Sequence, residues 1–292
     1  MADADKAILN SVSLSRRNFG HAFSGSLLAA ILSERLLAAV APLRPAPVVD
    51  TFYGKVAGNE RQGIAMYKGI PYGAPTGGNN RFLPPKPPAQ WPGVRDCTRF
   101  GSPAPQVNSD PPFFNDPNQP SEDCLVLNVW TPSPNRQKRG LPVIVWLHGG
   151  AFVFGSAGAP GYDCFNIAKA GNLVAVSINH RLNAFGYLYL GDSDERFASA
   201  GNVGQLDLIA ALQWIRDNIA AFGGDPGNVT IFGESGGGAK VGTLIGMPDA
   251  RGLFHKAIIQ SGSIPKVHEP AQAEKITHAI CTCPPSAPMA QI

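Results

Sequence analysis

The chain has 292 residues, which is the length of one large domain or two small ones. Charged residues make up only 15% of it, below the ~25% typical of soluble domains, which argues against intrinsic disorder and a solvated coiled coil. Its 33 glycines and 27 prolines are scattered without a period, which excludes collagen and indicates a globular protein rich in turns. A net charge of +3 on dispersed basic residues excludes a nucleic-acid-binding surface.

The first 47 residues differ from the rest and resemble a bacterial twin-arginine export signal. Arg16 and Arg17 precede a mildly apolar stretch at 22–33, and an Ala-Val-Ala sequence at 39–41 offers a processing site. The apolar stretch is too short to cross a membrane, so we expect no stable membrane span. We therefore expect a leader and linker over 1–47 and a periplasmic or secreted protein. The alternative is an amphipathic N-terminal helix on a cytoplasmic protein.

Runs of apolar residues in the body of the chain predict alternating strands and helices. The predicted strands are 48–56, 64–72, 124–130, 142–147, 173–178, 228–232 and 256–260, and the predicted helices are 203–222 and 236–245. Between them, residues 73–120 have little periodicity and predict long surface loops. Strands that are apolar on both faces and alternate with helices predict an α/β fold with a mostly parallel central sheet. Active sites of such sheets form at the carboxyl ends of the strands.

A Gly-x-Ser-x-Gly motif at 233–237 follows a predicted strand and precedes a predicted helix, which is the setting of a nucleophile elbow. We expect Ser235 to be the nucleophile on a sharp turn, where side chains at Gly233 or Gly237 would collide with backbone. The alternative is a glycine-rich phosphate-binding or packing turn. No Gly-Lys-Ser/Thr pair is present here to support a nucleotide-binding loop.

A second glycine-rich segment, His148-Gly149-Gly150-Ala151, follows the predicted strand 142–147. Small residues let the backbone approach a substrate oxygen, so we expect Gly150 and Ala151 to donate their N–H groups to an oxyanion. Gly236, directly after the nucleophile, is the third expected donor. We expect His148 to hold this loop by hydrogen bonding rather than to act as a catalytic base.

These motifs resemble the type-B carboxylesterase family of α/β-hydrolases, which includes bacterial p-nitrobenzyl esterases. Similar motifs occur in the family's order at 121–130, 179–186, 201–202, 222–226 and 254–262, so the resemblance runs over residues 48–266. The chain departs from the family at Gly236, where alanine is commoner, and at Gln205 and Leu208. Cys97 is displaced from the position of the family's first cysteine, which puts a bridge to Cys124 in doubt.

The resemblance implies acyl transfer, in which Ser235 attacks an ester carbonyl, a histidine takes the proton and a carboxylate orients the histidine. In such proteins the acid and the histidine follow the serine, far along the chain. Only His255, His268 and His278 follow Ser235 here. We expect His255 to be structural. Glu274 and His278, four residues apart on a predicted helix, are typical of a solvated surface pair.

We therefore expect the chain to lack the catalytic carboxylate and the catalytic histidine. Residues 267–292 diverge from the family and become Pro-rich after Ile280, so we expect a C-terminally truncated or frameshifted reading frame. We therefore predict low solubility and little or no esterase activity for the chain alone.

The five cysteines indicate neither a disulfide framework nor a metal site. An exported chain permits a Cys97–Cys124 disulfide, and the alternative is buried or unpaired thiols. His278, Cys281 and Cys283 lack a fourth ligand for zinc. We expect neither a metal nor a cofactor.

Three functions remain open at this point. The first is a serine carboxylesterase that acts on small-molecule esters with short-chain or aromatic groups. The second is a catalytically inactive fragment that keeps the fold. The third is a peptidase or lipase on the same fold, against which the motif around Cys124 argues.

Overall fold

The computed structural model describes residues 42–107, 115–132, 134, 140–191, 194–262 and 267–282. The predicted export motif, its processing site and Cys283 lie outside these residues. The chain divides into two compact units, Met1–Pro42 and Leu43–Ile292, and all elements below belong to the second unit.

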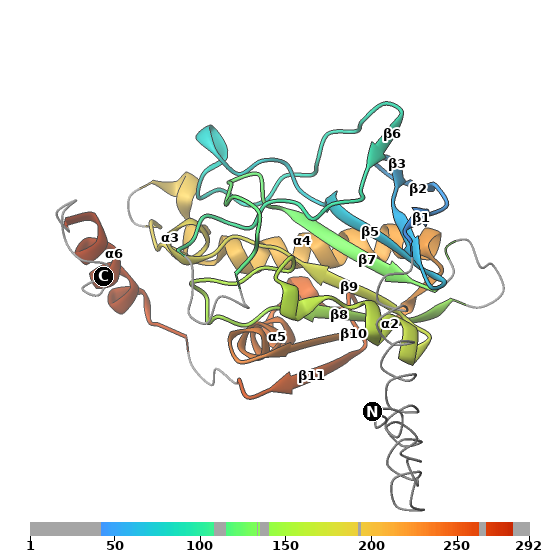
Figure 1. Ribbon diagram of the computed structural model, residues 1–292. Helices are drawn as coiled ribbons and strands as arrows, with labels where there is room; N and C mark the ends of the chain where they lie inside the picture. The colour runs from blue at the N-terminus through green and yellow to red at the C-terminus, as the bar shows by residue number, and fades with distance from the viewer. Residues whose placement is uncertain are drawn as a thin grey trace, which may run out of the picture. The chain divides into compact units, whose positions relative to one another are not determined.

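The described residues form one large sheet with the strand order β1-β4-β5-β7-β9-β8-β10-β11 (Figure 1). Its strands are β1 (Arg44–Pro45), β4 (Asn59–Arg61), β5 (Ile64–Pro71), β7 (Val126–Thr131), β9 (Val174–Ile178), β8 (Leu141–Leu147), β10 (Gly224–Glu234) and β11 (Lys256–Gln260). The pairings from β9 through β8 and β10 to β11 are parallel. Those from β1 to β9 are antiparallel, so the sheet is mixed and the expected parallel arrangement describes its C-terminal half.

A second, smaller sheet joins β2 (Val49–Thr51), β3 (Gly54–Ala57) and β6 (Val94–Asp96). The segment predicted as one strand at 48–56 is thus an antiparallel pair that turns at Phe52 and Tyr53. β6 lies within the predicted loop region 73–120, together with the short 3-10 helix η1 (Gly78–Asn80). Its three exposed residues give no apolar pattern, and pairing with β3 is what makes β6 a strand.

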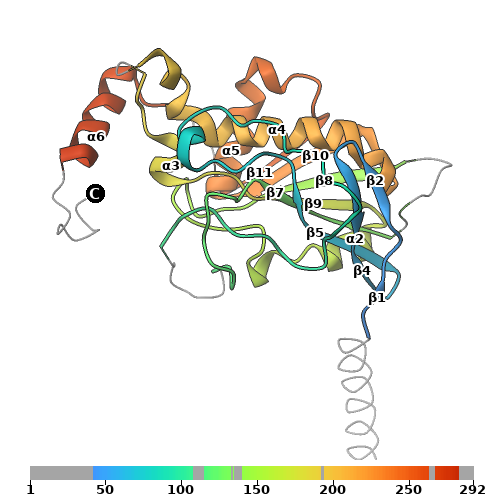
Figure 2. The same cartoon turned by 90° about the horizontal axis from the view of Figure 1, so that it is seen from above.

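Helices cover both faces of the large sheet (Figure 2). The long helix α4 (Val203–Asn218) continues into η6 (Ile219–Phe222) and shares one core with α5 (Gly236–Gly246), whereas α2 (Phe165–Gly171) packs in the second cluster. The remaining helices are α3 (Asn183–Tyr187), α6 (Pro270–Thr282), η3 (Pro160–Tyr162), η4 (Glu195–Phe197), η5 (Ala200–Asn202) and η7 (Pro248–Ala250). α2 and α3 are helices that periodicity did not predict.

Alternate residues of β8 face the two layers. Val143 and Val145 join the core shared with α4, whereas Ile144 and Trp146 pack on the α2 cluster. Side chains of successive strand residues point to opposite faces, so a strand covered on both sides is apolar throughout. This explains the continuous apolar run of the sequence.

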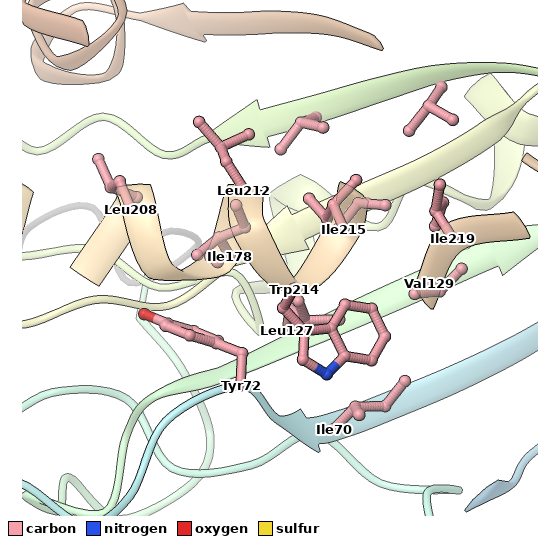
Figure 3. Packing of buried hydrophobic residues seen from close by; sticks show 14 of the residues in the cluster. Ile70, Tyr72, Leu127, Val129, Ile178, Leu208, Leu212, Trp214, Ile215 and Ile219 are labelled. Atoms are coloured by element: carbon pink, nitrogen blue, oxygen red, sulfur yellow. The ribbon is translucent and has the colours of Figure 1, made fainter. Parts of the chain in front are cut away.

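The α4 face of the sheet holds the main core (Figure 3). Leu208, Leu212 and Ile215 of α4 lie over Leu127 of β7 and Ile178 of β9, and all five side chains are fully buried. Burying one such side chain contributes about 1.5–3 kcal/mol relative to leaving it in water. This packing fixes α4 against the sheet.

The register of β8 and β10 brings two chain segments to one edge of the sheet. Leu147, the last residue of β8, pairs with Gly233 of β10. Because the two strands are parallel, His148 and Ser235 both lie just beyond the carboxyl ends of their strands. This edge is where the sequence predicts the active site.

Candidate active site

Ser235 lies on the sharp turn between β10 and α5, as the sequence predicts. Its backbone has φ 53° and ψ −121°, a region that non-glycine residues rarely adopt. In the described part of the chain, the hydrogen bonds of Ser235 are made by its backbone: its N–H donates to Gln260 O (2.8 Å), and its carbonyl accepts from Ala239 N (3.0 Å). The side chain is exposed, so the hydroxyl is open to a ligand.

Close backbone packing explains the glycines on either side of Ser235. A Cβ built on Gly233 would lie closer than 3.0 Å to the backbone of Gly237, and one built on Gly237 would meet the carbonyl oxygen of Leu147 just as closely. The expected collision with backbone is therefore present at both positions. The glycines let the turn press against the end of β8.

The loop after β8 lies directly beside Ser235. A Cβ on Gly149 would lie 3.7 Å from Cβ of Ser235, and one on Gly236 would contact the backbone of Ala151. Gly150 and Ala151 both have positive φ, 83° and 52°. The structure thus brings the loop that carries Gly150 and Ala151 beside Ser235, and Gly236 follows Ser235 directly. Their role as donors stays a prediction.

His148 is buried at the start of this loop. Its Nδ1 hydrogen-bonds to Gly149 O at 2.9 Å, and its ring lies 4.7 Å from the ring of His180. Burial, aided by the nearby charge of Lys240, lowers the pKa of His148 to about 3. The ring is therefore neutral near pH 7, and its bond to the loop fits the predicted holding role.

Lys240 is a polar residue of this region that the sequence reasoning missed. It lies on α5, is fully buried, and donates from Nζ to the carbonyl oxygens of His148 (3.1 Å) and Ala151 (2.9 Å). The sequence feature that could have pointed to Lys240 is a lysine in an otherwise apolar helix segment, five residues after the nucleophile.

Arg181 and Asp207 form a second buried polar contact. Nη2 of Arg181 lies 2.6 Å from Oδ1 of Asp207, and Nε and the backbone N–H of Arg181 both donate to Oδ2. Asp207 lies on the buried face of α4. The motif at 179–186 pointed to Arg181 but not to its partner, because the two residues are 26 positions apart.

The histidines after Ser235 do not form a triad with it in the described part of the chain. His255 accepts a hydrogen bond from Val229 N at Nδ1 (3.1 Å) and donates its own N–H to Val229 O, so it joins β10 to the start of β11. Glu274 and His278 lie exposed on α6, and His268 is exposed before it. Glu274 and His278 are joined by none of the ion pairs between described residues.

Cys97, Cys124 and Cys164 are buried free thiols, and Cys281 is an exposed one. The structure therefore has no Cys97–Cys124 bridge. Among the described residues, no group of three or more His, Cys, Asp or Glu side chains is placed to hold a metal ion. A search of the same residues finds no helix with the length and apolar character needed to span a bilayer.

Sequence comparisons show where the chain has relatives. A model of the carboxylesterase family matches residues 45–282, so the match continues through 267–282, where we expected the chain to diverge. The para-nitrobenzyl esterase of Bacillus subtilis (strain 168) is 46% identical over 218 residues, which are 74% of this chain and 44% of that protein. The medium-chain fatty acyl-CoA hydrolase precursor of Anas platyrhynchos is 41% identical over 267 residues, 86% of this chain and 47% of that protein. The chain thus spans less than half the length of these curated relatives.

Solved structures agree. A carboxylesterase of Geobacillus stearothermophilus superposes with a TM-score of 0.75 and 49% identity, covering 80% of this chain and 47% of that chain. A structure titled PNB esterase has a TM-score of 0.72 and 44% identity, with coverages of 80% and 47%. These neighbours confirm the predicted α/β-hydrolase fold. Because the family match runs through both the loop after β8 and the turn that carries Ser235, the chain belongs to the type-B carboxylesterase family.

Proposed function

We propose that this chain carries the nucleophile and oxyanion hole of a serine carboxylesterase that acts on small-molecule esters. The observation that carries the proposal is the backbone of Ser235, held at φ 53° beside the loop of Gly150 and Ala151. Strain of this kind persists only where the surrounding structure enforces it, and it is concentrated at functional sites.

The proposed reaction is acyl transfer. Oγ of Ser235 attacks the ester carbonyl carbon, and the N–H groups of Gly150, Ala151 and Gly236 bind the oxygen that becomes negative. The proton of the Ser235 hydroxyl passes to a base and from it to the leaving alcohol as the C–O bond breaks, and water then hydrolyses the acyl-serine to the carboxylic acid and the free serine. α5 begins at Gly236, so its N-terminal N–H groups add a favourable field for the developing charge.

The chain alone is proposed to be slow, because Ser235 has no base beside it among the described residues. Serine is a poor nucleophile without one, and loss of the base lowers rates by several orders of magnitude. The alternative, a chain without activity, follows if the oxyanion hole does not compensate for the base. The name of the Bacillus subtilis relative makes p-nitrobenzyl esters reasonable substrates to include in the test.

The test compares the 292-residue chain with its Ser235→Ala variant in the hydrolysis of p-nitrophenyl butyrate, with and without added imidazole. Because Ser235 is exposed, imidazole can act as the missing base. We expect a small rate that depends on Ser235 and rises with imidazole, together with a butyryl group on Ser235 detected by mass spectrometry. Identical behaviour of both proteins supports the inactive alternative. Turnover at ordinary rates of about 10 per second without imidazole contradicts the missing base.

The proposal includes export through a twin-arginine route, on the motif at Arg16 and Arg17. Replacing both residues by lysine should move the protein from the periplasm to the cytoplasm of a bacterial host. Equal periplasmic yield of the two versions counts against export by this route.

A further inference from the structure

Lys240 is completely buried and has no acidic partner among the residues that the structure describes. Its side chain is 0% exposed, and none of the ion pairs between described residues includes it. A buried ammonium group is costly unless other groups compensate for the lost hydration. An apolar residue at this position would avoid that cost, so the contacts that Lys240 makes call for an explanation.

Among the described residues, the hydrogen bonds and the ring contact of its Nζ all point to the loop beside Ser235. Nζ donates to the carbonyl oxygens of His148 and Ala151, and it lies 5.3 Å from the ring centroid of Phe152. The two carbonyls lie on either side of Gly149 and Gly150. One side chain therefore ties both ends of the segment that carries the expected N–H donors.

The loop needs such a tie because its conformation is unfavourable by itself. Ala151 has φ 52°, in the left-handed region that non-glycine residues avoid. The hydrogen bond at its carbonyl restrains the peptide group that follows. The backbone of α5 is itself anchored, since Gln205 Nε2 of α4 donates to Lys240 O at 3.0 Å.

We propose that Lys240 is a positioning residue: by binding the carbonyls of His148 and Ala151, its charged amine holds the oxyanion loop in place against Ser235. This inference rests on the proposed ester chemistry of Ser235. In its charged form the amine makes stronger hydrogen bonds to the carbonyls and adds positive charge behind the site of the developing oxyanion.

The neighbouring titratable groups leave Lys240 as the one that changes charge near neutrality. Burial lowers its pKa to about 7. Among the described residues, the titratable groups that the charge of Lys240 acts on are His148 at the end of β8 and His180 after β9, and burial lowers the pKa of both so that they stay neutral. Raising the pH through about 7 should therefore weaken the tie.

The first experiment measures amide exchange of Val153 and Phe154, whose N–H groups both donate to Gly150 O and close the turn of this loop. Wild type, Lys240→Met and Lys240→Gln are compared by NMR at about pH 6 and about pH 8, with intrinsic rates divided out. At the lower pH, Lys240→Met should exchange about tenfold faster than wild type, as expected for lost charge-assisted hydrogen bonds. Lys240→Gln, which keeps a donor, should be intermediate.

The pH dependence separates positioning by the charge from simple packing. The difference between wild type and Lys240→Met should shrink at the higher pH, while amides of β9 and the control Lys86→Met, an exposed lysine bonded to Asn80, stay unchanged. Equal exchange in all proteins, or the same acceleration at both pH values, overturns the proposal. If Lys240→Met does not fold, Lys240→Gln is compared with wild type. Faster exchange at the lower pH that shrinks at the higher pH then supports the proposal, and equal exchange or a constant difference overturns it.

The second experiment repeats the imidazole-assisted, Ser235-dependent hydrolysis with the same variants. The ratio of the wild-type rate to the Lys240→Met rate should fall as the pH rises from about 6 to about 8, whereas a ratio independent of pH contradicts positioning by the charge. If wild type itself shows no Ser235-dependent rate, the proposed function fails. The exchange experiment then still judges the role of Lys240 separately.

Discussion

Gly236 and Ala151 touch through their backbones: a Cβ on Gly236 would lie closer than 3.0 Å to the nitrogen, Cα and carbonyl oxygen of Ala151. Gly236→Ala should therefore push the oxyanion loop away and destabilise the protein by about 1–3 kcal/mol, as overpacking typically does. The unfolding free energy in urea measures this. Gly246→Ala, at a position with no atom within 4 Å of the added methyl, is the matched control and should not destabilise.

Adding Ala151→Gly to Gly236→Ala should recover part of the lost stability. Glycine adopts positive φ without strain, so the loop can shift away from the new methyl group. The destabilisation of the double variant is compared with the sum of the destabilisations of the two single variants. Equality of the two values would show that the loop cannot adjust.

The backbone of Ser235 is strained, so a substitution that relieves the strain should raise stability even though it removes the nucleophile. Ser235→Gly should raise the unfolding free energy by about 1 kcal/mol, because a positive φ costs glycine little. Ser235→Ala removes the same hydroxyl but keeps the strain, so it should stay near wild type. Equal melting temperatures of the two variants would mean that the turn is not strained.

The buried pair of Arg181 and Asp207 should be sensitive to loss of one partner. Asp207→Asn leaves the guanidinium of Arg181 without its countercharge, which typically costs about 3–5 kcal/mol. Chemical denaturation compares it with Asp194→Asn, which breaks the exposed pair with Arg196. The surface variant should be indistinguishable from wild type. A loss of unfolding free energy as small for Asp207→Asn as for Asp194→Asn would contradict the burial of the Arg181–Asp207 pair.

Stability should fall in acid because of the buried histidines. The pKa of His148 is about 3 in the folded protein and about 6.5 in an unfolded chain, so between these values the unfolded state binds more protons. The unfolding free energy therefore decreases as the pH falls from about 6.5 towards 3, by about 1.4 kcal/mol per pH unit for this group. His148→Gln should reduce the slope by about one proton. The same slope in wild type and His148→Gln would contradict the prediction.

β11 should promote self-association. All five of its residues are exposed, and in the described part of the chain it is the last strand of the sheet, with Ile258 46% exposed. An apolar strand with an open edge is a template for pairing with another chain. Ile258→Lys should reduce aggregation in light scattering more than Ile245→Lys, which changes an exposed isoleucine of α5 and not of the edge strand. An equal reduction of aggregation by both substitutions would show that exposed apolar side chains in general, and not the open edge of β11, cause the aggregation.

The elbow, the loop after β8 and the strands of the parallel half were predictable because each is encoded locally. Apolar runs predicted β8, β9 and β11, and the glycines around Ser235 predicted the turn. β6 was missed because its exposed residues have no pattern and long-range pairing makes it a strand. Lys240 was missed because its hydrogen-bonding partners lie about 90 positions earlier in the chain, where only the folded structure brings them near.

The pairing of Leu147 with Gly233 has a consequence for how this site tolerates change. Main-chain hydrogen bonds between adjacent strands set the distance between the nucleophile and the oxyanion loop, and these bonds do not depend on side-chain identity. Substitutions in the core below can therefore alter stability and the shape of a binding surface while the reacting groups keep their separation. Such an arrangement lets substrate preference diverge among relatives without rebuilding the chemistry.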